Sequence, residues 1–238
     1  METTFIILCF LGFFILFGSI FFLFYYFSKR TVIRRKLKKI PTKKISQFLN
    51  GDVGKIIGKV EFVGEPLISP LSNRPCAYYH VYVEQHKSSG KNSRWVKLIE
   101  EEVAGKFLIR DGSHSALVDC IQIKTYLVQD QVFQSGTFND ATSNLEHFLS
   151  QRGHTSVSFL GLNKSIRYKE GILESDELVA VAGKGEWKDA KDLQLPESYG
   201  RILHISQTPE QAVYLSDDPT TVKFKSKDEY SNNTYTTR

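Results

Sequence analysis

An uninterrupted apolar run near the N-terminus constrains this chain more than any other feature of its sequence. Residues 5–27 read FIILCFLGFFILFGSIFFLFYYF, a stretch of 23 residues without a charge that holds nine of the 17 Phe. As a helix it would span roughly 34 Å, enough to cross a hydrocarbon core of about 30 Å. No basic residue precedes it and no small-residue cleavage site follows it, which favours an uncleaved anchor over a signal peptide. We predict a single N-terminal transmembrane helix over residues 5–27.

The segment that follows the apolar run is strongly basic. Residues 28–44 read SKRTVIRRKLKKIPTKK, with nine Lys and Arg and no acid. The positive-inside rule therefore predicts a single-pass membrane protein with its N-terminus outside and its C-terminal domain in the cytoplasm. A helix that continues from the membrane to Ile40 and ends before Pro41 is expected.

Two interpretations of this basic juxtamembrane segment stay open. It can bind anionic lipid headgroups, because each Lys or Arg near an anionic leaflet gains about 1 kcal/mol. It can equally be a flank that only stops translocation. The candidate membrane-surface residues are Lys29, Arg30, Arg34, Arg35, Lys36, Lys38 and Lys39.

The remainder of the chain is mildly acidic and carries few cysteines. Of the 31 basic and 26 acidic residues, 22 basic and 25 acidic residues lie after residue 44. Stacking of nucleic-acid bases on Tyr78, Tyr82 and Trp95 would need a basic groove, so we predict no nucleic-acid partner. Three cysteines (Cys9, Cys76 and Cys120) form no disulfide framework and suit a reducing compartment.

The soluble part has the pattern of a mainly β domain. Short runs rich in β-formers alternate with turn residues, and Asp111-Gly112 marks a hairpin within residues 106–119. Residues 144–153 break this pattern, because Leu145, Phe148 and Leu149 have helical spacing and Gly153 suits a helix end. We predict a compact, OB-like barrel or sandwich over residues 45–215 with one short helix, and a polar, disordered tail over residues 216–238.

Catalytic and metal sites are weakly supported. Cys76 and His80 are four positions apart, roughly 13 Å along a strand, whereas a nucleophile and its base need about 3 Å. A Cys-dependent hydrolase would have to bring a distant His (His114, His147, His154 or His204) to Cys76, and this alternative stays open. Cysteines with zinc-site spacing and phosphate-binding loops are missing, so we predict no metal and no cofactor. Cys76 is expected to be a small packed residue.

Two blocks of the sequence carry a family resemblance. The first, GKVEFVGEPLISPLSNRPCAYYHVYVE, includes Gly58, Leu67, Ser69, Pro70 and Cys76. The second, HFLSQRG followed by IRYKEGILESDELVAVAGKG, includes Arg167, Glu170 and Gly183. Together they resemble the GIDE (or BAM, "beside a membrane") domain, the membrane-proximal domain of organelle RING-type E3 ubiquitin ligases. The resemblance covers about residues 45–215, and the chain looks like a RING-less, prokaryote-type member.

This resemblance implies a function as well as a fold. The RING zinc ligands are missing, so the ligase activity of the family does not carry over to these residues, and a family member of this kind would need a RING from another chain. The resemblance implies instead a non-catalytic interaction module on the cytoplasmic face of a membrane, with an unidentified protein partner. The binding residues that it suggests are Ser69, Pro70, Asn73, Arg74, Tyr78 and His80; the structural ones are Gly58, Leu67, Cys76, Arg167, Glu170 and Gly183.

Overall fold

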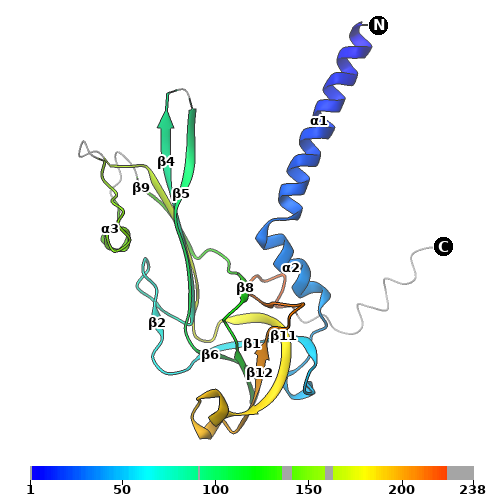
Figure 1. Ribbon diagram of the computed structural model, residues 1–238, viewed down its shortest axis with the longest axis vertical. Helices are drawn as coiled ribbons and strands as arrows, with labels where there is room; N and C mark the ends of the chain where they lie inside the picture. Colours follow the sequence, from blue (N-terminus) through cyan, green and yellow to red (C-terminus); the bar gives the residue numbers. More distant parts are fainter. Residues whose placement is uncertain (1, 91, 136–140, 159–162, 224–238) are drawn as a thin grey trace, which may run out of the picture.

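A closed five-stranded barrel forms the centre of the molecule (Figure 1). The computed structural model describes residues 2–90, 92–135, 141–158 and 163–223. The barrel strands are β1 (Val53–Phe62), β6 (Phe107–Asp111), β7 (His114–Val118), β12 (Arg201–Ser206) and β11 (Leu178–Asp189). They pair in that order, and β11 pairs back with β1 to close the circuit. The β7–β12 pair is parallel and the other four are antiparallel.

Side-chain alternation on β11 explains how the barrel packs on both of its faces. Val179 and Val181 lie in the barrel core, whereas Ala180 and Ala182 face outward into a second apolar cluster. Two further strands, β13 (Val213–Ser216) and β8 (Ile123–Tyr126), extend the sheet beyond β11. The small Ala side chains let a helix approach this outer face closely.

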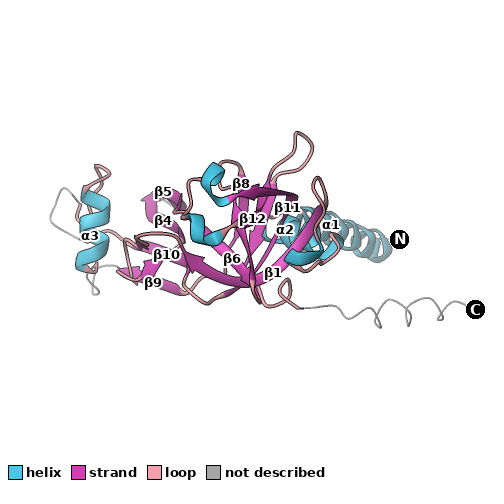
Figure 2. Cartoon of the chain, turned by 90° about the horizontal axis from the view of Figure 1, so that it is seen from below, coloured by secondary structure: helices cyan, strands magenta, loops and turns pink. Residues whose placement is uncertain are grey.

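A four-stranded antiparallel sheet projects from the barrel. Its order is β5 (Asn92–Ala104), β4 (Tyr78–Ser89), β10 (Ile166–Leu173) and β9 (Gln131–Ser135). The helix α3 (Ser143–Ser150) packs on it through Leu145, Phe148 and Leu149, with Thr142 as its N-cap. The part of this sheet that carries α3 lies far from the N-terminal helices (Figure 2), and the β4–β5 hairpin extends on the same side of the barrel as α1 (Figure 1).

One two-stranded sheet and three short 3-10 turns complete the described elements. β2 (Leu67–Ile68) pairs with β3 (Pro75–Cys76). The 3-10 turns are η1 (Ile45–Gln47), η2 (Ala190–Leu193) and η3 (Glu197–Tyr199). The predictions of a mainly β domain, of the hairpin at Asp111-Gly112 and of the short helix near residue 144 are confirmed.

The N-terminal region is a pair of helices and not the continuous helix expected to run to Ile40. α1 (Glu2–Tyr26) ends before a break at Phe27 and Ser28, and α2 (Lys29–Lys39) follows. The prediction of continuity is wrong because the Ser28 side chain accepts a hydrogen bond from the Thr31 backbone N–H and caps a new helix. Among the described residues no single helix meets the length and hydropathy expected of a membrane span, but α1 from Phe10 and α2 meet it together as a pair bent by 61°.

α2 belongs to the folded domain. Ile33 and Leu37 are buried on the outer face of the barrel against Ala180, Ala182 and Tyr214. The fold also continues past the expected domain end at residue 215, since Ser216, Asp218 and Thr221 are buried. The rest of the predicted tail, residues 224–238, lies outside the described residues.

Candidate functional site

The loop between β2 and β3 carries most of the predicted binding residues. Within residues 69–74, Ser69 donates its backbone N–H to the Arg74 carbonyl over 2.9 Å, and Asn73 donates its own to the Ser69 carbonyl over 3.1 Å. The Ser69 and Ser72 hydroxyls lie 2.6 Å apart. Asn73 at the tip has a left-handed backbone conformation with φ 59°. These bonds give the loop one defined shape.

Glu170, in the middle of β10, fixes this loop through hydrogen bonds to its backbone. Its side chain is 1% exposed, and its two oxygens accept the backbone N–H groups of Leu71 (2.9 Å) and Ser72 (3.0 Å). Arg74 forms an ion pair with Glu174 at 3.0 Å. The two blocks of the family resemblance therefore meet here, because the carboxylates of the second block fix the loop of the first.

The six predicted binding residues differ in how far they are exposed to solvent. Ser69 and Tyr78 are buried, so neither offers a surface contact. Pro70, Arg74 and His80 are partly exposed, and Asn73 is exposed. Sequence reasoning missed Ile68, which precedes the loop and has 54% of its surface exposed. Its position directly before Ser69, the first residue of the loop, was the available signal.

Cys76 is packed, as predicted. It is 0% exposed, and burial together with the charges of Glu170 and Glu174 raises the pKa of its thiol to about 11. A catalytic thiol needs the opposite environment, one that stabilises the thiolate. Cys76 therefore has the surroundings of a structural residue.

The remaining motif residues have packing roles that explain their residue types. A Cβ on Gly183 would lie 2.9 Å from the Ser206 carbonyl oxygen, and one on Gly58 would collide with the Arg110 backbone. Leu67 pairs with Cys76 in the β2–β3 ladder. Arg167 forms an ion pair with Glu84 and places its guanidinium 4.4 Å from the centre of the Trp95 ring.

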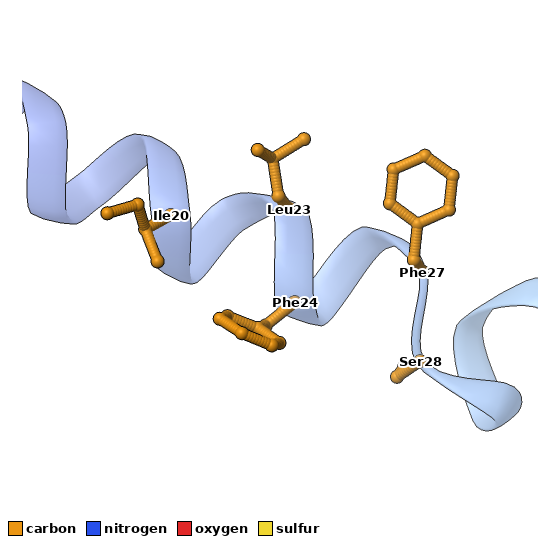
Figure 3. Close-up of a pocket in the computed structure, with 5 residues that line it drawn as sticks. All are labelled: Ile20, Leu23, Phe24, Phe27 and Ser28. Carbon is orange, nitrogen blue, oxygen red and sulfur yellow. The ribbon is translucent and has the colours of Figure 1, made fainter.

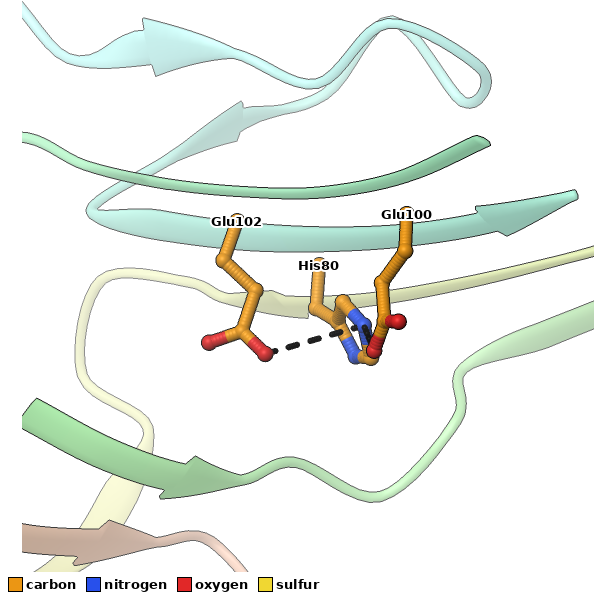
Figure 4. A group of neighbouring side chains, drawn as sticks. All are labelled: His80, Glu100 and Glu102. Atoms are coloured by element: carbon orange, nitrogen blue, oxygen red, sulfur yellow. Dashed lines mark ion pairs between the residues drawn. The ribbon is translucent and has the colours of Figure 1, made fainter. Parts of the chain in front are cut away.

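His80 lies in a cluster of titratable side chains on adjacent strands β4 and β5 (Figure 4). His80 Nε2 lies 3.4 Å from a Glu100 oxygen and 3.7 Å from a Glu102 oxygen. The three candidate ligand atoms lie within 4.8 Å of one another, a spacing that could hold a cation. Ammonium groups already neutralise both carboxylates, since Lys97 pairs with Glu100 and Lys29 with Glu102.

Glu102 connects this cluster to α2. Its oxygens accept hydrogen bonds from Tyr78 and Thr125 as well as from Lys29, the first residue of α2. Burial alone would raise the pKa of Glu102, but the bonds from Lys29 and Tyr78 outweigh burial and lower it. The cluster thus fastens the start of α2 to the four-stranded sheet.

The basic residues of α2 fall into two groups, those that pair with a carboxylate of the domain and those that do not. Lys29 reaches Glu102, and Arg30 and Arg34 lie 3.8 Å and 3.3 Å from the buried carboxylate of Asp218. The other four candidate membrane-surface residues, Arg35, Lys36, Lys38 and Lys39, have no carboxylate partner among the described residues. Three of the seven predicted residues therefore bind the protein's own domain.

α1 presents apolar side chains to its surroundings on every face. Its large apolar side chains from Phe10 to Phe24 are 41–76% exposed. Near its C-terminal end Ile20, Leu23, Phe24, Phe27 and Ser28 line an open, almost wholly apolar hollow (Figure 3). A helix with so much exposed apolar surface needs another apolar environment around it.

The chain was compared with protein families, with curated proteins and with solved structures. No family model, no curated protein and no solved structure matches this chain.

Proposed function

We propose that this chain is a membrane-anchored interaction module that is not itself catalytic. α1 is the anchor, α2 connects it to the barrel, and the β domain offers a binding surface on the cytoplasmic side. The observation that carries the proposal is the contrast between an α1 that exposes large apolar side chains and an α2 that packs on the barrel. Such a pairing holds a folded domain next to a membrane without a flexible linker.

The cytoplasmic placement rests on charge. Nine basic residues and no acid follow the apolar run, and this asymmetry favours retention of that side in the cytoplasm. Single-pass topology rests on the length of the apolar run.

The binding surface that we propose is the loop at residues 69–74 together with Ile68. Glu170 and Arg74 hold the loop in one conformation, so little conformational entropy remains to be lost when a partner binds. Ile68 supplies an exposed apolar side chain at its base, and Asn73 supplies polar groups at its tip. A protein partner with a small apolar pocket and a polar rim would fit this surface.

We further propose an OB-like barrel in a GIDE-type, RING-less domain. In chain order the barrel strands are the first to fifth, and around the circuit they follow the order first, second, third, fifth, fourth. This closed order with one parallel pair supports the OB-like assignment. The meeting of both resemblance blocks at Glu170 supports the family assignment.

Membrane anchoring is tested by extraction of the full chain after expression in a bacterial cell. We expect it to stay in the membrane pellet in alkaline carbonate and to dissolve in detergent. Leu16→Arg, which places a charge in the middle of α1, should release a large share into the carbonate supernatant. Lys36→Arg is the matched control on α2. Release of the unaltered chain by carbonate would refute the anchor.

The loop is tested by photo-crosslinking within membranes of the native host. A photoreactive amino acid at Asn73 should give a discrete protein adduct, and Ile68→Glu should abolish that adduct. The same amino acid at Ile121, which is 82% exposed in the connection between β7 and β8, is the control position. Identical adducts from both positions, or an adduct that Ile68→Glu leaves intact, would contradict binding at the loop.

A further inference from the structure

A basic cavity lies in the angle between α1 and α2. It has a volume of about 320 Å³ and is lined by Tyr25, Thr31, Arg34, Arg35, Lys38 and Lys39. Tyr25 belongs to the last turn of α1, and the other five residues lie at helical spacing on one face of α2. The opposite face of α2 carries Ile33 and Leu37, which are buried against the barrel.

Arg35 is the central residue of this cavity. Its Nη1 atom is buried, and within the described residues it has no hydrogen-bond partner. Its guanidinium lies 4.0 Å from the centre of the Tyr26 ring, which holds it at the end of α1. A buried guanidinium nitrogen without an acceptor is costly, so the geometry is suited to an external anion.

The charge around Arg35 is not neutralised by the protein. No acid occurs between residues 28 and 44. Arg34 shares its charge with Asp218, but Lys38 and Lys39 have no carboxylate partner in the part of the chain that the structure describes. Lys38 and Lys39 also complement the dipole at the C-terminal end of α2, whereas Arg35, in mid-helix, does not. A ligand with a phosphate group would satisfy Arg35 and add partners for both lysines.

We infer that this cavity binds the phosphate headgroup of an anionic lipid. The inference rests on the proposed membrane anchoring, because the cavity begins where the apolar surface of α1 ends at Phe27. At that level the headgroups of the adjacent leaflet are the most abundant phosphates. The proposed site differs from a general attraction between the basic segment and the membrane, because only some of the basic residues belong to it. Lys29 and Arg30 pair with carboxylates of the domain, and Lys36 lies outside the cavity.

Native mass spectrometry of the full chain in detergent micelles tests this site. Phosphatidylglycerol and phosphatidylcholine with the same acyl chains are titrated separately, and bound lipid is counted. We expect phosphatidylglycerol to bind roughly tenfold more tightly. Arg35→Gln combined with Lys38→Gln should reduce that preference to less than about twofold.

The matched control removes the same charge from the same segment. Lys36→Gln combined with Lys44→Gln alters two exposed lysines outside the cavity and should keep the preference within about twofold of the unaltered chain. Equal loss in both double variants would overturn the site in favour of unspecific attraction. No preference in the unaltered chain would also overturn it.

Inorganic phosphate distinguishes the source of the anion. An excess of inorganic phosphate should leave bound phosphatidylglycerol nearly unchanged, because the acyl chains hold the lipid against α1. Displacement of the lipid would assign the cavity to a soluble anion and overturn the lipid assignment. Carbonate extraction reports on the anchor independently, so failure of the site and failure of the proposed function give different results.

Discussion

Glu170 shows how a single buried carboxylate can determine the shape of a surface loop. The sequence identified it through a family resemblance, but it could not reveal that its oxygens would accept the N–H groups of Leu71 and Ser72, about a hundred positions earlier. Periodicity predicts the strand that carries Glu170. The loop that Glu170 contacts is determined by the pairing of β10 with β4. This pairing is long-range and leaves no local signal in the sequence.

Glu170→Gln should destabilise the domain by about 2 kcal/mol, because an amide cannot accept both backbone N–H groups and a charged acceptor is lost. Thermal unfolding of the full chain in micelles, followed by circular dichroism, measures this. Glu174→Gln is the matched control and should cost less than about 1 kcal/mol, because the Arg74–Glu174 pair is partly exposed. Equal effects would show that Glu170 has no special role in the loop.

Asp217 should make stability depend on pH. Burial, reinforced by the charges of Glu177 and Asp130, raises its pKa from 3.8 to about 7. The folded chain therefore keeps a proton that the unfolded chain releases, and the stability that this proton contributes is present below about pH 4 and lost as pH rises to about 7. Asp217→Asn should flatten this part of the profile of unfolding temperature against pH. An unchanged slope between pH 4 and 7 would assign the dependence to other groups.

At the scale of elements, strands were easier to predict than the boundary between the two N-terminal helices. Alternation and turn residues predicted the mainly β pattern and located the hairpin of β6 and β7, because these signals are local. The break at Ser28 was missed because the apolar and basic segments both suit a helix. The chain changes direction at Ser28 because Ile33 and Leu37 of α2 are buried against the barrel. This tertiary packing outweighs the helix propensity of the segment.

Leu37→Ala should loosen α2 from the barrel. Leu37 is fully buried, and removal of its side chain should cost about 2–4 kcal/mol of docking free energy. Hydrogen–deuterium exchange of the full chain should then accelerate about thirtyfold or more across residues 29–39, with little change in the barrel strands. Lys36→Ala, on the exposed side of α2, is the control. Uniform acceleration of α2 and barrel would mean that they unfold as one unit.

At the scale of the molecule, the proposed anchor and the projecting sheet restrict each other. The β4–β5 hairpin extends in the same direction as α1 in Figure 1, and Lys87 and Arg94 pair near its outer end, so a bilayer at right angles to α1 would also reach them. Charged side chains in hydrocarbon cost several kcal/mol. We therefore expect the chain to tilt as one unit when it enters a membrane, with the angle between α1 and α2 unchanged, until the hairpin stays in water.

Thiol labelling in lipid nanodiscs tests this tilt. Ser88→Cys at the hairpin should react rapidly with a membrane-impermeant maleimide, whereas Phe21→Cys on α1 should be protected, in a chain with Cys9→Ala and Cys120→Ser. Buried Cys76 needs no replacement. In micelles without a continuous bilayer Ser88→Cys should react at the same rate. Protection of Ser88→Cys only in nanodiscs would place the hairpin in the membrane and contradict the tilt.

The direct docking of α2 also limits where this domain can meet other molecules. With α1 as the proposed anchor, the 11 residues of α2 would keep the barrel within roughly 16 Å of the point where the chain would leave the bilayer. A partner on the same membrane would search a thin layer of solution instead of the cell volume, at an effective concentration that reaches the millimolar range for short connections. Weak contacts then suffice for a specific complex, and a partner released from the membrane would lose most of its apparent affinity.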